Sequence, residues 1–361
     1  GALTIATSNT SNVVRDTSTN NFNSIVVTRA QDVTIQDTNG LTLSGNVAGN
    51  LSLQTGALTL GTTNVAGQAT LTTQAAAFGD VTISGALNLT ATGAVSDTGT
   101  LIVRGATTLN ASGQTITLDS VANDFVGAVA ITAASSVTLK DRNALTLSGT
   151  VASALGITTG GQLTLGDTTI GTSGTSSATL AVTSGGDIGQ QSTASALRVY
   201  GNSSFDLQGN NLTLANKAGG DGINDFGGKL TVLNANNVML SDDNALALGK
   251  FVAAGNVDIL TDAALTQSIT AGEAMAVSGS LNLNVTGEGL DDCSDITLSN
   301  SNQLMGDVTI EHGQNVVLTT VSALHLVSAD ICSNLTLNTG GKLYNSNAWI
   351  VEGNLAINSA G

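Results

Sequence analysis

The two histidines, His312 and His325, are the first candidates for acid–base or metal chemistry. His325 is the middle residue of the triplet Leu324-His325-Leu326, and His312 follows Glu311. In a strand, alternate residues point to opposite faces, so the middle residue of an apolar-x-apolar triplet points outward. The sequence has no HExxH pattern and no evident third ligand. We therefore predict surface histidines, His325 on a side and His312 in a corner, without a catalytic or metal-binding role.

Carboxylates are the next candidates, because glycoside hydrolysis needs two of them about 5 to 10 Å apart. Asp258 is isolated, and Asp291, Asp292 and Asp295 cluster in an acidic segment without a neighbouring arginine. Only 10 residues of the chain are Lys or Arg, which leaves few cations to hold an acidic sugar. We predict that the chain is not an enzyme, with a β-helical carbohydrate-active enzyme as the less favoured alternative.

One segment resembles a calcium-binding repeat. Residues 219–226 read GGDGINDF, close to G-G-x-G-x-D-x-apolar with Asn224 in the place of the aspartate. Such sites need tandem copies, since consecutive turns share the ion. The sequence has one copy, so we predict a Gly-rich loop, no metal site and no cofactor.

Outward threonines could form the flat ladders of ice-binding solenoids. The middle position of the triplets, however, varies among Thr, Ser, Asn, Ala and Met. Because threonine is also simply a good strand residue, we favour that explanation.

The two cysteines, Cys293 and Cys332, stand in matching contexts, CSDITL and CSNLTL, 39 residues apart. Two turns of a coiled chain separate them, which is about 9.6 Å if the turns stack directly. A disulfide requires Cα atoms within about 7 Å. A loop excursion over 286–295 could close the gap, so both a disulfide and free thiols remain open.

The elements that position these residues are repeats. A 24-residue stretch opens at Phe22, recurs at Phe125 and Phe226, and has a degenerate copy at Leu304. The first three copies start 103 and 101 residues apart, and the last follows after 78. Each of the first three carries an Asp-x-Asn pair, which becomes Thr320 and Ser322 in the fourth. The pairs are Asp37/Asn39, Asp141/Asn143 and Asp242/Asn244.

A shorter period lies inside the long one. Apolar-x-apolar triplets start at Val33, Leu51, Ala69 and Leu87, each 18 residues after the last. Short strands repeated at this spacing predict an all-β fold, a β-solenoid in which each coil stacks in parallel on the one before and only stacked coils bury a core. We expect three-sided coils of about 18 to 20 residues and one continuous domain over 1–361. About 19 coils would give a rod of roughly 90 Å.

The three sides can be placed along the chain. Near its end they start at Val308, Val316 and Leu324, and the next coil starts near Val327. The long repeat is then about five coils, with each Asp-x-Asn pair at the corner between the second and third sides, where Asp and Asn suit turns. We expect glycines 45, 149 and 249 to turn the next corner. We also expect Phe22, Phe125 and Phe226 to fill wider layers of the core.

Composition supports a strand-rich chain and excludes several partners. Proline is absent and the net charge is −16. Proline removes a donor from a sheet ladder, so its absence fits a nearly all-strand chain. Nucleic acid and anionic membranes attract Lys/Arg patches, so we expect neither as a partner. We find no membrane span, and we expect segments 217–228 and 286–295 to protrude as loops. The opening GALTIATS suggests a piece of a longer protein.

The coils of about 19 residues, the xVTLxDxNxLTLSG phrasing and the proline-free composition resemble the filamentous-haemagglutinin type of large bacterial exoprotein. This resemblance implies a right-handed parallel β-helical shaft, secreted to the cell surface. It implies a role in adhesion, biofilm formation or contact-dependent interaction.

We therefore expect an extracellular structural and adhesive shaft that provides reach and stiffness. Its partners would be a cell-surface receptor, a carbohydrate or further copies of itself. The alternative is a self-assembling filament subunit, because an exposed solenoid end is an open sheet edge that invites end-to-end stacking.

Overall fold

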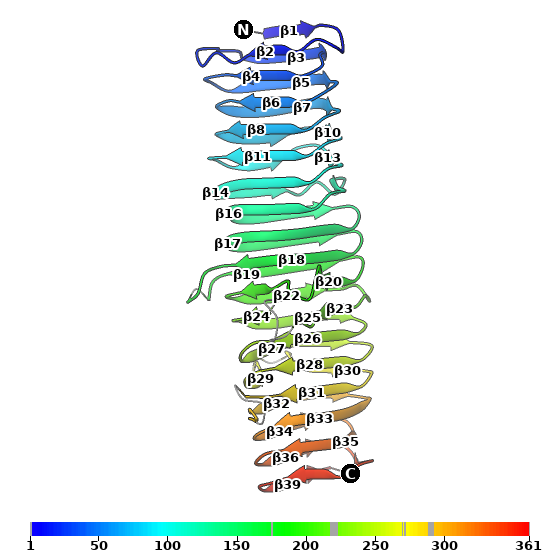
Figure 1. Ribbon diagram of the computed structural model, residues 1–361. Helices are drawn as coiled ribbons and strands as arrows, with labels where there is room; N and C mark the ends of the chain where they lie inside the picture. Colours follow the sequence, from blue (N-terminus) through cyan, green and yellow to red (C-terminus); the bar gives the residue numbers. More distant parts are fainter. Residues whose placement is uncertain are drawn as a thin grey trace. The chain divides into compact units, whose positions relative to one another are not determined.

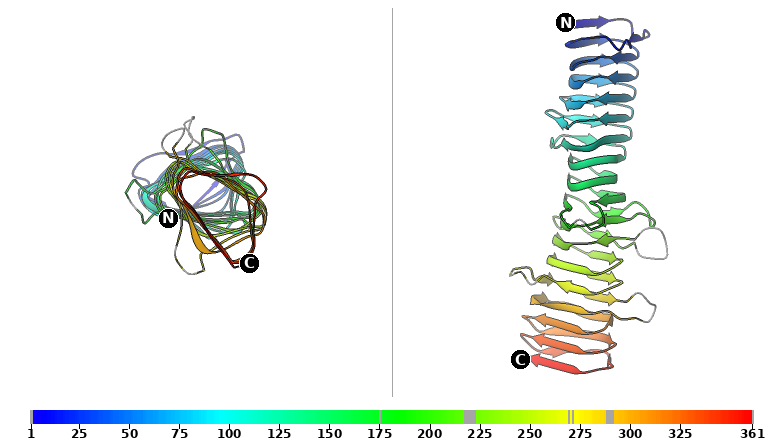
Figure 2. Two further views of the ribbon diagram at one scale, coloured as in Figure 1. Left: turned by 90° about the horizontal axis from the view of Figure 1, so that it is seen from below. Right: turned by 90° about the vertical axis from the view of Figure 1, so that its left-hand side faces the viewer.

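The computed structural model describes residues 2–174, 176–216, 223–268, 270, 272–287 and 292–360. Over these residues there is no helix, and parallel strands stack as a β-solenoid of about 17 turns. The predicted all-β solenoid is confirmed. The chain divides into two compact units, Gly1–Thr164 and Leu165–Gly361, each of which is described by itself (Figures 1 and 2). A single continuous domain over 1–361 stays a prediction.

The strands of the first unit are mostly short because a corner follows every few residues. They are β1 (Ala2–Ala6), β2 (Val13–Arg15), β3 (Ser24–Arg29), β4 (Val33–Gln36), β5 (Leu41–Val47), β6 (Leu51–Gln54), β7 (Ala57–Val65), β8 (Ala69–Thr73), β9 (Ala75–Phe78), β10 (Val81–Ile83), β11 (Leu87–Ala91), β12 (Val95–Asp97), β13 (Leu101–Val103), β14 (Thr107–Leu118), β15 (Asp124–Phe125), β16 (Val129–Asp141) and β17 (Leu145–Thr159).

Strand β18 (Leu163–Ile170) contains the boundary between the units. The second unit then continues with β19 (Thr179–Ser184), β20 (Ile188–Gln190), β21 (Leu197–Val199), β22 (Asn202–Asp206), β23 (Leu212–Leu214), β24 (Asp225–Phe226), β25 (Lys229–Ala235), β26 (Val238–Asp242), β27 (Leu246–Ala253), β28 (Val257–Thr261), β29 (Leu265–Gln267), β30 (Met275–Val277), β31 (Leu281–Val285), β32 (Ile296–Leu304), β33 (Asp307–Gly313), β34 (Val316–Thr320), β35 (Leu324–Ile331), β36 (Leu335–Thr339), β37 (Leu343–Tyr344), β38 (Trp349–Val351) and β39 (Leu355–Ser359).

Each turn has three sides, as predicted. In the first unit β8, β9 and β10 form one turn, and β11, β12 and β13 lie in parallel on them in the same order. The 18-residue period is the length of a turn, since Val33 pairs with Leu51, Leu51 with Ala69 and Ala69 with Leu87.

The core is formed by the outer residues of the apolar-x-apolar triplets. In β11 the burial alternates along LNLTA, with the leucines and the alanine inside and the polar residues exposed. Phe125 and Phe226 are both 1% exposed and belong to the largest buried side chains, as expected for residues that fill wider layers. Phe22 is only partly buried, so it does not fill the core in the same way.

The long repeat does not span a whole number of turns. In the first unit the ladder that starts at Val33 reaches Val129 after five turns. The repeat counterpart of Val33 is Val137, which lies one side further along the same turn. The prediction of about five coils is therefore corrected to five turns plus one side, and the copies at 22 and 125 have their Asp-x-Asn corners on different sides.

The same shift occurs between the two copies in the second unit. There Val238 leads through Val257 and Leu281 to Val308 after three turns. The repeat counterpart of Val238 is Val316, which again lies one side further.

One predicted register is wrong. Val308 pairs with Leu326, not Val327, and Thr309 then pairs with Ser328. Val327 is therefore the extra residue of a β-bulge, at a corner that β35 passes without ending.

Turns in the second unit are also longer than expected. For example, Ile188 pairs with Leu212, 24 residues on, and Leu281 pairs with Val308, 27 residues on. The extra residues lie between the strands, which explains about 17 turns in place of the predicted 19.

Two of the three predicted corner glycines need their special backbone. Gly45 and Gly149 have φ values of 117° and 133°, a region that side chains disfavour. A Cβ on either would fall 1.9 Å from a backbone oxygen of the previous turn. Gly249 has no positive φ, and a Cβ there would meet side-chain atoms only, at 2.7 Å or more. Gly249 therefore does not use a positive φ at its corner.

Candidate functional site

The aspartate of each Asp-x-Asn pair closes a corner with both carboxylate oxygens. Asp141 accepts hydrogen bonds from the backbone N–H of Asn143 at 2.7 Å and of Phe125, in the preceding turn, at 2.6 Å. The same two bonds recur in the first copy, at 2.9 and 2.6 Å, and in the third, at 3.4 and 2.8 Å. Where the chain bends, these backbone N–H groups have no carbonyl partner in a neighbouring strand. The buried carboxylates accept their hydrogen bonds instead. The predicted turn-forming role is confirmed.

An asparagine two residues before each copy belongs to the same corner, and it was not predicted from the sequence. Its backbone carbonyl accepts a hydrogen bond from the backbone N–H of the residue that follows the corner aspartate. In the fourth copy, where Thr320 replaces the aspartate, the donor is the residue that follows Thr320. The constant spacing ahead of each copy is the signal that could have found it. The four residues are Asn20, Asn123, Asn224 and Asn302.

Three of these four asparagine side chains are fully buried and bond inside the solenoid. Asn123 is fully buried; its Oδ1 accepts from the backbone N–H of Leu101 at 2.8 Å, and its Nδ2 donates to Asp97 at 2.6 Å. Asn224 is also fully buried and bonds to Leu197 and Gln190. The residue at the aspartate position of the calcium-like repeat is therefore engaged inside the protein.

The corner carboxylate of the third copy titrates near neutral pH. Burial raises the pKa of Asp242 to about 7, and the carboxylates of Asp225 and Asp243 add to the rise, while the two backbone N–H groups oppose it. Burial also raises the pKa of Asp141. Perturbed carboxyl groups can mark catalytic sites. These two are explained by the corner itself.

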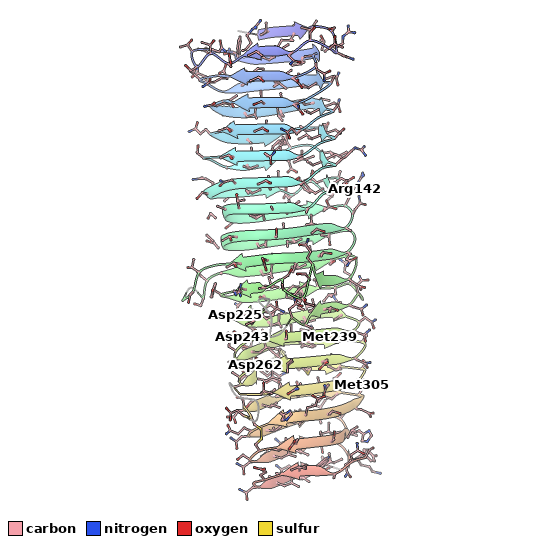
Figure 3. The ribbon with its side chains drawn as sticks, in the orientation of Figure 1. Arg142, Asp225, Met239, Asp243, Asp262 and Met305 are labelled. Atoms are coloured by element: carbon pink, nitrogen blue, oxygen red, sulfur yellow. A yellow bond between two sulfur atoms is a disulfide. The ribbon has the colours of Figure 1, made fainter. Side chains whose placement is uncertain are left out.

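The residue inside the Asp-x-Asn pair differs in charge between copies (Figure 3). In the second copy Arg142 forms an ion pair with Asp124. In the third copy Asp243 takes the equivalent place, and burial together with the carboxylates of Asp262 and Asp225 raises its pKa. The third copy therefore carries a row of acidic residues where the second copy carries an ion pair.

A ladder of asparagines lines one corner of the second unit. Asn211 Oδ1 accepts from the backbone N–H of Asn237 at 3.1 Å, and Asn237 Oδ1 accepts from that of Asn256 at 2.9 Å. Asn256 Oδ1 then accepts from Ser280 at 3.0 Å. Each asparagine thus bonds the start of the next turn, which makes it part of the fold.

A groove of about 510 Å³ runs along this ladder. Besides the asparagines, its lining includes Asp187, Met239, Asp258 and Asn282 and no Lys, Arg or His. Met239 is 46% exposed (Figure 3), and the Oδ1 atom of Asn282 has no partner among the described residues. This groove, which we call the asparagine groove, combines amide and carboxylate groups with one exposed apolar side chain, that of Met239.

The two histidines lie in different surroundings. The Nδ1 atom of His312 is buried without a hydrogen-bond partner in the described part of the chain. His325 points outward, as predicted, but it is bonded on both ring nitrogens: Nδ1 to Asp307 at 2.7 Å and Nε2 to Ser346 at 2.8 Å. Sequence reasoning missed these partners, although Asp307 lies 18 residues, one turn, before His325.

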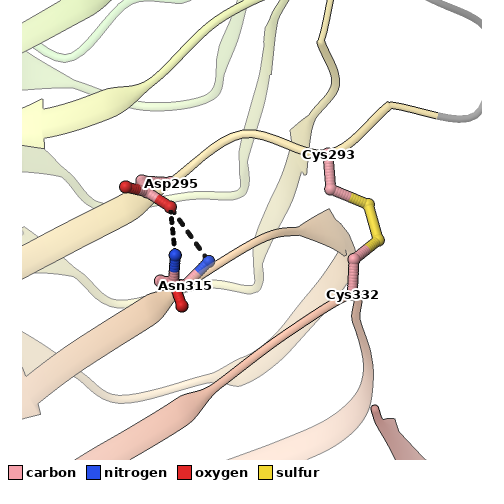
Figure 4. Close-up of a disulfide and its surroundings, with 4 residues drawn as sticks. All are labelled: Cys293, Asp295, Asn315 and Cys332. Carbon is pink, nitrogen blue, oxygen red and sulfur yellow. Dashed lines mark hydrogen bonds between the residues drawn. A yellow bond between two sulfur atoms is a disulfide. The ribbon is translucent and has the colours of Figure 1, made fainter. Parts of the chain in front are cut away.

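Cys293 and Cys332 form a disulfide with a Cα–Cα distance of 6.4 Å (Figure 4). Directly stacked turns would place these residues too far apart. An isolated bridge between Thr286 and Cys293 turns the chain back on itself, which fits the loop excursion considered above. Beside the disulfide, Asp295 bonds Asn315 in the following turn at 2.9 and 3.0 Å. Of the two alternatives left open by the sequence, a disulfide and two free thiols, the structure therefore has the disulfide.

Comparison with known families gives one match. Repeats of unknown function (DUF5649) match residues 30–77, 72–132, 161–233, 235–311 and 313–361, which together are most of the chain. The chain belongs to this family. No curated protein and no solved structure matches it.

The boundaries of the DUF5649 repeats differ from the copies that open at 22, 125, 226 and 304. For instance, one match ends at 233 and the next begins at 235, inside the third copy. The matched segments therefore cover the solenoid turns, but they do not begin or end at the Asp-x-Asn corners.

Some predicted features of this DUF5649 chain lie wholly or partly outside the described residues. These are 217–222 of the first predicted loop, which include the whole GGDG stretch, and 288–291 of the second, which include Asp291. Of the remaining acidic candidates, Asp258 bonds Asn282 at 3.2 Å and Asp295 is engaged as above. Among the residues that the structure does describe, no group of three or more His, Cys, Asp or Glu could hold a metal ion. No helix there is long and apolar enough to cross a membrane.

Proposed function

We propose that this chain is a structural and adhesive shaft segment of a secreted bacterial surface fibre. The observation that carries the proposal is the continuous parallel ladder within each unit. Its corners are closed by buried Asp and Asn side chains; Asp141, for example, accepts hydrogen bonds from the backbone N–H groups of Phe125 and Asn143. Such a chain gains stiffness from stacking neighbours and needs no cofactor for it.

The disulfide supports an extracellular location. Disulfides persist in oxidising compartments and are rare in the cytosol. The repeat style shared with filamentous-haemagglutinin-like exoproteins favours the same place.

Scattering of the full chain in solution tests the shaft. The proposed continuous shaft, with about 17 turns at about 4.8 Å each, would have a maximum dimension of roughly 80 Å. A compact particle with a radius of gyration near that of a 361-residue globule, about 21 Å, would contradict the proposal.

For adhesion we propose the asparagine groove as the contact surface and a neutral carbohydrate as its partner. Amide and carboxylate oxygens accept hydrogen bonds from sugar hydroxyls, and the side chain of Met239 offers an apolar contact. The lack of basic residues in the lining disfavours acidic glycans.

Binding to an array of neutral glycans tests this surface. Met239→Arg should abolish binding, because it fills the groove with a long cation. Met305 is 75% exposed and does not line the groove, so Met305→Arg is the matched control and should bind as the wild type does. Equal binding by both variants would refute the groove as the contact surface.

A further inference from the structure

Three polar side chains in the second unit form a directed hydrogen-bond chain on the surface. The Oδ1 atom of Asp307 lies 2.7 Å from Nδ1 of His325, and Nε2 of His325 lies 2.8 Å from Oγ of Ser346. Each ring nitrogen of the imidazole therefore has one partner, a carboxylate on one side and a hydroxyl on the other. This order of acid, imidazole and hydroxyl is the arrangement that activates a serine nucleophile.

The solenoid holds the first two groups in place. Asp307 and His325 are paired residues of the adjacent parallel strands β33 and β35, and His325 pairs in turn with Tyr344 of β37. The rings of His325 and Tyr344 meet edge to face, with centroids 6.5 Å apart. The imidazole is therefore fixed by the ladder, the carboxylate and the tyrosine ring.

Ser346 is exposed in the segment between β37 and β38, so a substrate can reach it from solvent. In the described part of the chain, the backbone N–H groups of Asn345 and Ser346 make no hydrogen bond, whereas that of Asn347 bonds Val327 at 2.9 Å. Two free amide donors thus lie beside the hydroxyl in the sequence. Amide donors at such a position can stabilise an oxyanion.

We propose that Asp307, His325 and Ser346 form a serine-nucleophile site that takes acyl groups from small activated esters. The Oγ atom of Ser346 attacks the carbonyl carbon while His325 accepts its proton. The C–O bond to the leaving alcohol then breaks, and His325 returns the proton to that alcohol. Water, activated by the same imidazole, hydrolyses the acyl-serine to free acid. Asp307 orients the imidazole and stabilises its protonated form.

A fluorophosphonate probe on the full chain tests the proposal, because it forms a Ser–O–P bond with loss of fluoride only at an activated serine. We expect peptide mass spectrometry to find the label on Ser346, and a burst of p-nitrophenol from p-nitrophenyl acetate. His325→Ala should lower the labelling rate at least about 100-fold, and Asp307→Asn at least about tenfold. Ser346→Ala should remove the label.

Ser301, an exposed serine of β32, supplies the control. Ser301→Ala should label as the wild type does. If Ser346 in the folded wild-type chain is labelled no faster than Ser301, the three residues only tether the 345–348 segment and the proposal is overturned. Fluorescence of Trp349, the one tryptophan, checks that each variant is folded.

Discussion

At the scale of single residues, Gly149 is one of the places where the backbones of successive turns come very close. Its φ is 133°, and a Cβ added there would lie only 1.9 Å from the backbone oxygen of Ile131, which leaves no room for a side chain. We expect Gly149→Ala to lower the free energy of unfolding by about 3 kcal/mol, measured by urea denaturation followed by circular dichroism.

Gly249 lies at the corresponding corner of the third copy, one residue before Lys250, which aligns with Gly149. Since it has no positive φ, Gly249→Ala should cost less than about 1 kcal/mol. Equal losses at both glycines would show that backbone conformation is not what makes Gly149 necessary.

Asp242 gives the second unit a pH dependence. Its pKa of about 7 in the folded chain lies above the value of about 3.9 for an unfolded aspartate. The folded state therefore binds the proton more tightly, and the stabilisation from this group, present below about pH 4, is lost as pH rises to about 7. The loss is at most about 4 kcal/mol.

The test is the free energy of unfolding between pH 4 and pH 7, followed by Trp349 fluorescence. Asp242→Asn should flatten the pH dependence across this window. A variant as pH-dependent as the wild type would place the titrating group elsewhere.

Asp243 and Asp225 of the third copy take the places of Arg142 and Asp124, which form the ion pair of the second copy. Asp243→Arg should create the equivalent of the pair between Arg142 and Asp124 and remove repulsion from Asp262. We expect a gain of about 0.5 to 1 kcal/mol, measured by thermal unfolding at low ionic strength. The reciprocal change, Arg142→Asp, should destabilise the first unit, and a gain there instead would rule out the charge explanation.

Among single residues, those that form turns could be predicted from the sequence and those with long-range partners could not. Asp141 was recognisable because aspartate followed two residues later by asparagine is a local turn signal. His325 was correctly placed on the outside. Its bonds to Asp307 and Ser346 depend on which residues stack one turn away, and a one-residue shift in turn length changes that.

At the scale of elements, the disulfide fastens the chain across two turns. It closes a loop of 39 residues, for which chain entropy predicts about 4 kcal/mol of stabilisation. Reduction should lower the stability of the second unit by up to this amount, observed through Trp349 during urea unfolding. A Cys293→Ala/Cys332→Ala double variant should no longer respond to reductant; a continued response would assign the effect to something else.

Strand positions followed directly from the triplets, and the pairing of Val33 with Leu51 and of Val316 with Leu335 was predicted correctly. The start of the next turn at Val327 was not, because β35 passes its corner with a bulge. A bulge leaves the hydrophobic pattern almost unchanged, since Leu326 and Val327 are both apolar. The residue at which one side ends and the next begins is thus the feature that the hydrophobic pattern locates least well.

At the scale of the whole molecule, the fold class could be predicted from the sequence because every turn carries apolar triplets that are buried only when another turn stacks on them. The sequence could not predict the number of turns, which insertions between strands reduced to about 17. End-to-end assembly stays a prediction. Negative-stain electron microscopy of the chain at high concentration should show filaments if solenoid ends stack; single particles alone would exclude it.

In both units the long repeat advances by whole turns plus one side, which bears on how such a gene can lengthen. Because the three sides are built from the same triplets, a duplicated copy can begin on any side and still find a strand to pair with. Unequal recombination can therefore add or delete copies, and the strands on either side of the new junction can still pair. Selection can then set the length of the protein independently of its surface chemistry.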